Sequence, residues 1–221
     1  MDNQKIIIGY WDLRGIVAPI KYLLEYLKVD YEDKYHFYGE APTFNKDSWL
    51  LVKDHLGFDF PNLPYLIQGD FKLTESQAIY RYICRKYGPE LLGKTIADKA
   101  IVDMVMSVTV DLRTTSYEMI YDTGDRKAMQ DLGYGVFEKI SRFLGDKQFI
   151  AGDYLTFPDF FIYENIELFD YVCDQGGLCK RFPNLATYRE RIANLPGVKE
   201  YLGSDRSLKR PFNGKRALIN N

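Results

Sequence analysis

A run of strand-forming residues between Phe60 and Ser76 constrains this chain more than any other feature of its sequence. The pattern YLIQGDFKL predicts a β-hairpin that turns at Gly69-Asp70. The Thr74-Glu75-Ser76 sequence that follows is typical of a helix start, where unpaired backbone N–H groups attract a carboxylate. If the peptide bond before Pro64 is cis, Leu63 can offer its backbone to an extended peptide. Together these features predict a site for a small anionic peptide, against the alternative of a generic hairpin followed by a generic helix cap.

Composition excludes several classes of protein. The 221 residues contain 29 Lys plus Arg and 31 Asp plus Glu, so the nearly balanced charge gives no reason to expect a nucleic acid as a partner. No apolar run approaches the roughly 18 residues of a membrane span, and the N-terminal MDNQKIIIGYW is not a signal peptide pattern. Cys84, Cys173 and Cys179 are unpatterned, and His36 and His55 stand apart, so neither a disulfide framework nor a metal site is expected. We therefore expect a cytoplasmic globular protein, with no membrane partner and no metal.

Residues 1–88 alternate between strand and helix patterns. The expected elements are a buried strand at Lys5–Tyr10, a helix that starts near Pro19 and runs through Leu27, a strand at Val29–Tyr35, a short helix holding Trp49, Leu50 and Lys53, the hairpin, and a helix from Glu75 to about Tyr87. This βαβ then ββα order predicts an α/β domain of thioredoxin type.

Residues 89–221 have a helical pattern almost throughout. Gly88-Pro89 ends the preceding helix, and Thr95–Asp98 resembles a capping box that opens a long apolar stripe. A similar cap at Thr156–Asp159 opens the apolar helix FFIYENIELF, which we expect at the centre of this half. The tail from Lys209 to Asn221 is basic and irregular. The sequence thus predicts a thioredoxin-like N-terminal domain, residues 1–88, and an all-α C-terminal domain, residues 89–221.

Tyr10 is a candidate for chemistry because it ends the first predicted strand. Open α/β sheets place their ligands beyond the carboxyl ends of such strands. A phenol there could donate a hydrogen bond to an anionic sulfur and favour a thiolate over a thiol. The alternative is a tyrosine that only packs and caps the strand.

Several segments resemble cytosolic glutathione S-transferases, and most closely the mu class, over nearly the full length of the chain. The segments are GYWDLRG (Gly9–Gly15), GEAPTFNKDSWL (Gly39–Leu50), LGFDFPNLPYL (Leu56–Leu66), the TES helix start and AGDYLTFPDF (Ala151–Phe160). The resemblance implies the glutathione transferase architecture, with the glutathione site in the first domain and the electrophile pocket completed by the second.

The same resemblance implies roles for individual residues. Tyr10 would hydrogen-bond the glutathione sulfur, with Trp11 and Leu13 beside the thiol and the electrophile. Lys46, Trp49 and Lys53 would hold the glycyl carboxylate of glutathione, and Asn62, Leu63 and cis-Pro64 would pair with its cysteinyl part. Glu75 and Ser76 would bind the γ-glutamyl end, whose ammonium group would be approached by Asp111 from the other subunit. Arg113 and Tyr121 would complete the electrophile pocket, Tyr121 as a general acid, although Tyr117, one turn earlier on the same helix, could fill that role.

A homodimer is also implied. Phe60 would be a hydrophobic anchor inserted into the other subunit, and Arg81 would lie near the dimer two-fold axis. The alternative for Phe60 is packing against its own domain. Two positions depart from the usual mu pattern: Glu75 stands where Gln is usual, and Lys46 stands where Arg is frequent, which keeps the charge but loses bidentate geometry.

The function implied is conjugation of the glutathione thiolate to small hydrophobic electrophiles by a detoxifying enzyme, with glutathione as co-substrate and no tightly bound cofactor. Three alternatives remain open at this point. They are a non-catalytic protein that sequesters apolar ligands, a glutathione-dependent isomerase or peroxidase, and a structural protein. The phenol of Tyr10 argues against sequestration, because sequestration needs no group facing a sulfur.

Overall fold

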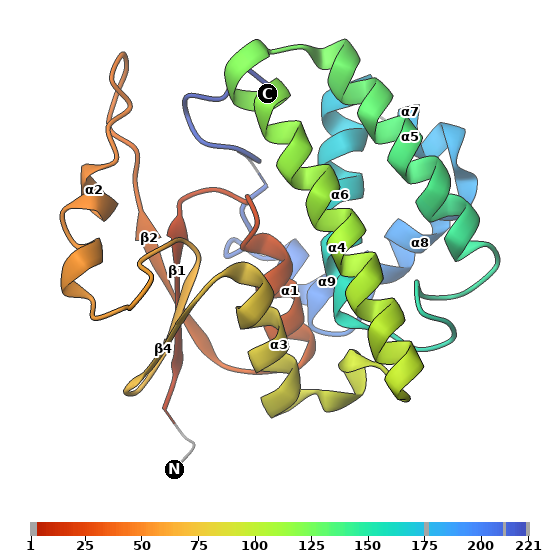
Figure 1. The fold of residues 1–221 in the computed structure, drawn as a ribbon, viewed down its shortest axis with the longest axis horizontal. Helices are drawn as coiled ribbons and strands as arrows, with labels where there is room; N and C mark the ends of the chain where they lie inside the picture. Colours follow the sequence, from red (N-terminus) through yellow and green to blue (C-terminus); the bar gives the residue numbers. More distant parts are fainter. Residues whose placement is uncertain (1–3, 175–176, 210, 220–221) are drawn as a thin grey trace.

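The computed structural model describes residues 4–174, 177–209 and 211–219. A four-stranded mixed sheet organises the first half of the chain (Figure 1). Its strands are β1 (Ile6–Trp11), β2 (Tyr31–His36), β3 (Tyr65–Gln68) and β4 (Phe71–Thr74). The spatial order is β2-β1-β3-β4, with β1 parallel to β2 and antiparallel to β3, and β3 antiparallel to β4. The predicted thioredoxin-like arrangement is confirmed, and the hairpin turns at Gly69-Asp70 as expected.

Three α-helices accompany the sheet. They are α1 (Ala18–Tyr26), α2 (Asp47–Leu50) and α3 (Ser76–Tyr87). Figure 1 shows α1 and α3 between the sheet and the helical second half, and α2 at the opposite side of the sheet. The expectation of one helix holding Trp49, Leu50 and Lys53 is wrong, because α2 ends at Leu50 and Lys53 begins a separate 3₁₀ turn, η1 (Lys53–His55).

Helices form the second half of the described chain. They are the 3₁₀ turn η2 (Pro89–Leu92), α4 (Ile96–Glu118), the π-helical turn η3 (Met119–Thr123), α5 (Arg126–Leu144), α6 (Phe157–Asp174), α7 (Gly177–Arg181), α8 (Pro183–Ala193) and α9 (Val198–Gly203). As predicted, α6 lies at the centre, and its aromatic residues receive α1 of the first half: Tyr22 meets Tyr163, and Tyr26 meets Phe160. Within the ranges described, no helix combines the length and apolarity needed to cross a bilayer.

Both predicted caps are present, with one difference. Thr95 and Asp98 form a reciprocal capping box at the start of α4. At α6 the buried Asp159 carboxylate accepts bonds from both the backbone N–H and the hydroxyl of Thr156. The Thr156 hydroxyl therefore donates a hydrogen bond here. Leaving the fully buried Asp159 carboxylate without donors would be costly, whereas the helix start can do without the hydroxyl as an acceptor.

The long helix α4 does not continue as an α-helix to Tyr121. It ends at Glu118, and the π turn η3 follows, in which the Gly124 N–H reaches back to the carbonyl of Met119, five residues earlier. Regular α-helical spacing is therefore lost between Asp111 in α4 and Tyr121 in η3, so the expectation that Tyr121 lies on the same helix as Tyr117 is wrong.

The C-terminal segment connects the two halves. Backbone N–H groups of Arg14 and Gly15, in the loop after β1, donate to the carbonyls of Pro211 and Phe212 at 3.0 Å and 2.9 Å. Further along, the Leu218 N–H donates to the carbonyl of Ile120 at 2.7 Å. The segment therefore spans the boundary between the sheet domain and the end of α4, which is where the candidate site lies.

Candidate active site

A cleft of about 310 Å³ opens at the boundary between the two halves of the chain. It is lined by Tyr10, Trp11, Leu13, Tyr38, Lys46, Tyr117, Tyr121, Asp122 and Arg216. The structure thus brings together the residues predicted from the end of β1 and from the end of α4. Tyr117 and Tyr121 both line the cleft, so both alternatives for the general acid remain in place.

Tyr10 is held at the cleft by the loop that follows β1. Its hydroxyl accepts a bond from the Ile16 N–H at 3.4 Å, and its side chain is 9% exposed. Gly15 permits this approach: its φ is +47°, and a Cβ there would lie 2.6 Å from the Tyr10 hydroxyl oxygen. Burial, followed by the nearby Tyr117, raises the pKa of Tyr10 well above its usual value. The phenol therefore stays neutral and can donate its proton in a hydrogen bond.

Tyr121 lies across the cleft, in the π turn. Its hydroxyl accepts a bond from the Gly214 N–H at 2.9 Å, and its ring centroid is 6.0 Å from that of Tyr117. Burial raises the pKa of Tyr121 as well. The guanidinium of Arg216 lies 5.5 Å from the Tyr121 ring centroid. This side of the cleft thus presents two phenol groups near a cation, which is suited to an anionic oxygen.

The predicted peptide-binding edge has the expected backbone. The Leu63–Pro64 peptide bond is cis. The Leu63 N–H donates to the Asn62 side-chain oxygen at 2.9 Å, and the Asn62 amide donates to the Glu75 carboxylate at 2.8 Å. Asn62 therefore joins the edge before the hairpin to the helix start after it.

Glu75 precedes α3 in an unusual backbone conformation. Its φ is 68° and its ψ is 111°, which is uncommon for a residue with a side chain. Such conformations are found at ligand sites more often than elsewhere. Ser76 begins the helix, and the first N–H groups of a helix have no partner within it. The helix start is thus able to receive an anion, as the sequence predicts.

The residues predicted for the other end of a peptide lie on the α2 side of the sheet. Lys46 immediately precedes α2 and lines the cleft, whereas Trp49 and Lys53 lie outside its lining. Trp49 is 6% exposed, is stacked on Tyr65 at 5.8 Å, and meets the His36 ring edge-on at 5.1 Å. Aromatic packing therefore holds Trp49 in place beside the sheet.

The remaining predicted residues lie elsewhere. Asp111 is exposed on α4 and does not line the cleft of its own chain, and Arg113 is buried and does not line it either. Phe60 is 80% exposed, so the alternative of packing against its own domain is excluded. Arg81 donates to Asp103 at 2.6 Å and thereby ties α3 to α4.

Three residues of the lining were not predicted. Tyr38 stacks on Trp11 at 4.4 Å and 29°, and its place just after β2 parallels that of Tyr10 at the end of β1. Asp122 and Arg216 had no local signal, because the π turn and the C-terminal segment reach the cleft only in the folded chain. Within the residues described, no three His, Cys, Asp or Glu side chains gather as a metal site.

Comparison with known proteins decides the family. The family model of the glutathione S-transferase N-terminal domain matches residues 7–85, and that of the C-terminal domain matches residues 110–205. The chain belongs to the glutathione S-transferase family. Among curated relatives, glutathione S-transferase Mu 1 of Oryctolagus cuniculus is 39% identical, over 95% of this chain and 96% of the relative. Glutathione S-transferase Mu 3 of Homo sapiens is 38% identical, over 99% and 97% of the two chains.

Solved glutathione S-transferases have the same fold. The crystal structure of the glutathione S-transferase Blo t 8 is 30% identical and covers 97% of this chain, with a TM-score of 0.82. The pi-class glutathione S-transferase of Onchocerca volvulus covers 96% of this chain with a TM-score of 0.83, and at 24% identity it supports the fold alone. The predicted family, its mu class and its two-domain architecture are therefore confirmed.

Proposed function

We propose that this glutathione transferase uses the Tyr10 hydroxyl to stabilise the thiolate of glutathione, which then attacks a small hydrophobic electrophile in the cleft. The observation that carries the proposal is the buried phenol of Tyr10 in the lining of the cleft that Tyr121 also lines. The reaction as proposed requires no metal and no tightly bound cofactor, since glutathione is a co-substrate. Proximity and electrostatic stabilisation of the sulfur anion supply the catalysis.

The peptide-binding edge supports a defined orientation for glutathione. In the proposed complex, the cysteinyl part pairs with the backbone of Leu63, whose carbonyl precedes cis-Pro64. The γ-glutamyl carboxylate of glutathione lies at the helix start at Ser76. The Glu75 carboxylate accepts a hydrogen bond from the γ-glutamyl ammonium group. Lys46, together with Trp49 and Lys53 on the α2 side, holds the glycyl carboxylate. This orientation directs the sulfur toward Tyr10 and the cleft.

The far wall of the cleft is suited to electrophiles that develop negative charge on oxygen. Tyr121 keeps its proton, because burial raises its pKa, and its hydroxyl already accepts a bond from Gly214. It can therefore donate to an alkoxide or enolate as the sulfur attacks. Trp11 and Leu13 supply the apolar part of the same cleft.

The test is the Tyr10→Phe variant. A charge-assisted hydrogen bond contributes about 1.5–3 kcal/mol, so its loss raises the thiol pKa of bound glutathione by about one to two units. The ultraviolet absorbance of the thiolate in the binary complex, titrated against pH, measures that midpoint. Turnover of an activated aryl halide should fall at neutral pH while calorimetry shows glutathione still bound. An unchanged titration midpoint would remove Tyr10 from this role.

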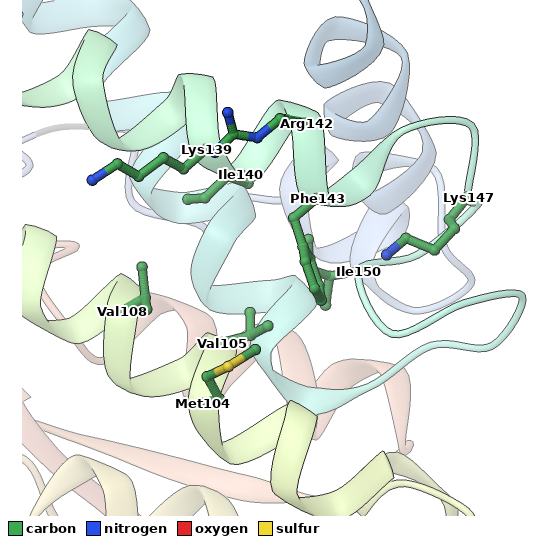
Figure 2. Close-up of a pocket in the computed structure, with 9 residues that line it drawn as sticks. All are labelled: Met104, Val105, Val108, Lys139, Ile140, Arg142, Phe143, Lys147 and Ile150. Carbon is green, nitrogen blue, oxygen red and sulfur yellow. The ribbon is translucent and has the colours of Figure 1, made fainter. Parts of the chain in front are cut away.

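A homodimer is part of the proposal. Between α4 and α5 lies a hollow of about 600 Å³ with an apolar floor that includes Met104, Val108, Ile140 and Phe143 (Figure 2). Its rim carries the cations Lys139, Arg142 and Lys147. The exposed Phe60 follows an acidic residue, Asp59. An aromatic ring beside a carboxylate complements an apolar hollow with a cationic rim, so we assign Phe60 of a second copy as its occupant.

The hollow and the aromatic anchor Phe60 belong to the same chain. In a dimer with two-fold symmetry, Phe60 of each subunit would therefore enter the hollow of the other, and the contact would form twice. Ile101, Met104 and Val108 are exposed apolar residues on α4, and they extend the apolar surface near the hollow. In such a pair Asp111 would approach the γ-glutamyl ammonium bound by the neighbouring subunit. We place the enzyme in the cytoplasm as a detoxifying transferase; the free thiols of Cys84 and Cys179 are compatible with that reducing compartment.

A further inference from the structure

Arg113 and Arg14 are both buried arginines, yet their surroundings differ completely. Arg14 donates to the Glu164 carboxylate at 2.6 Å and 3.1 Å and to the Tyr22 hydroxyl at 3.2 Å. Arg113 is 2% exposed, and in the part of the chain that the structure describes none of its three guanidinium nitrogens has a hydrogen-bond partner. A buried charge without a partner is costly and rare, so its presence requires an explanation.

The surroundings of Arg113 include phenols from three different elements. Its charge acts on Tyr10 of β1, on Tyr80 of α3 and on Tyr121 of the π turn. Tyr80 is fully buried, and its hydroxyl also has no partner among the described residues. Tyr117, one helical turn after Arg113, lines the cleft together with Tyr10 and Tyr121.

Within the ranges that the structure describes, no carboxylate is paired with Arg113. The carboxylate that acts on Tyr80 is Glu164, and that group is already paired with Arg14 and hydrogen-bonded by Tyr22. Cys84, which also acts on Tyr80, is neutral because burial raises its thiol pKa to about 12. Among the described residues, therefore, no carboxylate forms a hydrogen bond or an ion pair with Arg113.

We propose that Arg113 is a positioning residue for catalysis, whose buried, unpaired charge near Tyr10 stabilises the glutathione thiolate. The inference rests on the proposed role of Tyr10 at the sulfur. Arg113 does not touch the sulfur; it acts through the low-dielectric layer formed by the Tyr10 and Tyr117 rings, where a charge is screened far less than in water. A guanidinium is suited to this task because it remains protonated at every accessible pH.

In the free enzyme the buried, unpaired charge of Arg113 is unfavourable, and binding of the thiolate nearby offsets that cost. Arg113 should therefore not stabilise the free enzyme. A residue kept for structure would have the opposite signature, because its removal would lower the unfolding midpoint without affecting the ionisation of the sulfur.

The test compares Arg113→Gln, Arg113→Lys and the control Arg191→Gln, which removes an equal charge from a residue on α8 that donates to the Gln148 carbonyl. The measurements are the thiolate titration of the glutathione complex, the affinities for glutathione and for S-methylglutathione, and the thermal unfolding midpoint of the free enzyme. S-methylglutathione has no ionisable thiol, so it reports binding without sulfur charge.

We expect Arg113→Gln to raise the thiolate midpoint by about one pH unit, as for a unit charge several ångströms away at intermediate dielectric. Glutathione affinity at a pH above the wild-type midpoint should fall by up to about tenfold, and S-methylglutathione affinity should not change. The unfolding midpoint of the free enzyme should stay equal or rise. Arg113→Lys should keep most of the effect, and Arg191→Gln should match the wild type.

A second variant compensates the charge of Arg113 while keeping the arginine in place. Thr109 lies one turn before Arg113 on the same buried face of α4, so Thr109→Glu would place a carboxylate beside the guanidinium. This variant should raise the thiolate midpoint as Arg113→Gln does. Should Arg113→Gln not fold, the thiolate midpoint of Thr109→Glu decides whether the charge of Arg113 matters. Arg113→Lys, which keeps the charge and should keep the midpoint, is then its control.

Two results would overturn the inference: an unchanged thiolate midpoint in both Arg113→Gln and Thr109→Glu, or an equal loss of affinity for glutathione and S-methylglutathione. Tyr10→Phe distinguishes this failure from failure of the proposed function. If Tyr10→Phe shifts the midpoint and Arg113→Gln does not, only the role of Arg113 is lost. If neither shifts it, the proposed role of Tyr10 is lost as well.

Discussion

The backbone N–H of Gly214 donates a 2.9 Å hydrogen bond to the hydroxyl of Tyr121. This bond joins the C-terminal segment to the π turn at the far wall of the cleft. It uses a lone pair of the hydroxyl oxygen and leaves the proton of Tyr121 available for another acceptor.

For Tyr121→Phe we expect slower epoxide opening and slower Michael addition, by about ten- to a hundredfold, because a donor to the developing oxyanion is lost. Substitution of an aryl halide develops no alkoxide and should be nearly unaffected. Steady-state kinetics with one substrate of each type measure the difference, and Tyr117→Phe is the matched control on the same wall. An equal loss with both substrates, or a selective loss only in Tyr117→Phe, would exclude Tyr121 as the acid.

Ser76→Ala should weaken glutathione binding by about 1.5–3 kcal/mol, because one hydrogen bond to a charged carboxylate is lost at the start of α3. The rate with saturating glutathione should change little, since the contact is remote from the sulfur. Calorimetry measures the affinity, and Ser107→Ala, which removes an exposed hydroxyl on α4, is the control. Wild-type affinity in Ser76→Ala would mean that the γ-glutamyl carboxylate binds elsewhere.

Phe60→Ala should shift the protein from dimer toward monomer, since an aromatic anchor in a partner's pocket commonly contributes about 2 kcal/mol or more. Sedimentation velocity over a concentration series measures the change. Leu51→Ala removes a side chain that is also strongly exposed, at 72%, and should leave the dimer intact. Met104→Glu, in the floor of the hollow, should reproduce the effect of Phe60→Ala. A wild-type protein that sediments as a monomer at micromolar concentration would refute the assembly.

His36 should make stability depend on pH. It lies buried between Trp11 and Trp49, its Nδ1 is 2.9 Å from the Ser48 carbonyl, and burial lowers its pKa below the usual 6.5. Below about pH 6.5 the unfolded chain binds a proton at His36 that the folded chain does not bind. As the pH falls from about 6.5 toward the pKa of His36 in the folded protein, the free energy of unfolding therefore decreases, and below that pKa this dependence ends.

Urea unfolding at several pH values between about 5 and 8 measures this slope, which is at most about 1.4 kcal/mol per pH unit. His55→Gln, which alters an exposed histidine, should keep the slope, whereas His36→Gln should reduce it. An identical slope in the wild type and in His36→Gln would assign the pH dependence to other groups.

Features that depend on neighbours in the chain could be predicted from the sequence. The hairpin at Tyr65–Thr74, the capping box at Thr95–Asp98 and the strand ending near Tyr10 are set by turn residues, cap residues and short apolar runs. Longer motifs carried the family resemblance, and with it most of the site. Element ends were predicted less well, as at α2, because tertiary packing there outweighs local helix propensity.

What the sequence could not reveal depends on distant segments meeting. The π turn moves Tyr121 off the regular helical register, and its hydroxyl is fixed by Gly214, more than ninety residues further along the chain. Arg216 reaches the cleft only because the C-terminal segment bonds to the loop after β1. The sequence by itself determined the strands, caps, turns and family of this protein. Only the tertiary structure decided that Arg113 lies buried without a partner, because the burial and pairing of a charge are properties of the packed chain and not of its local sequence.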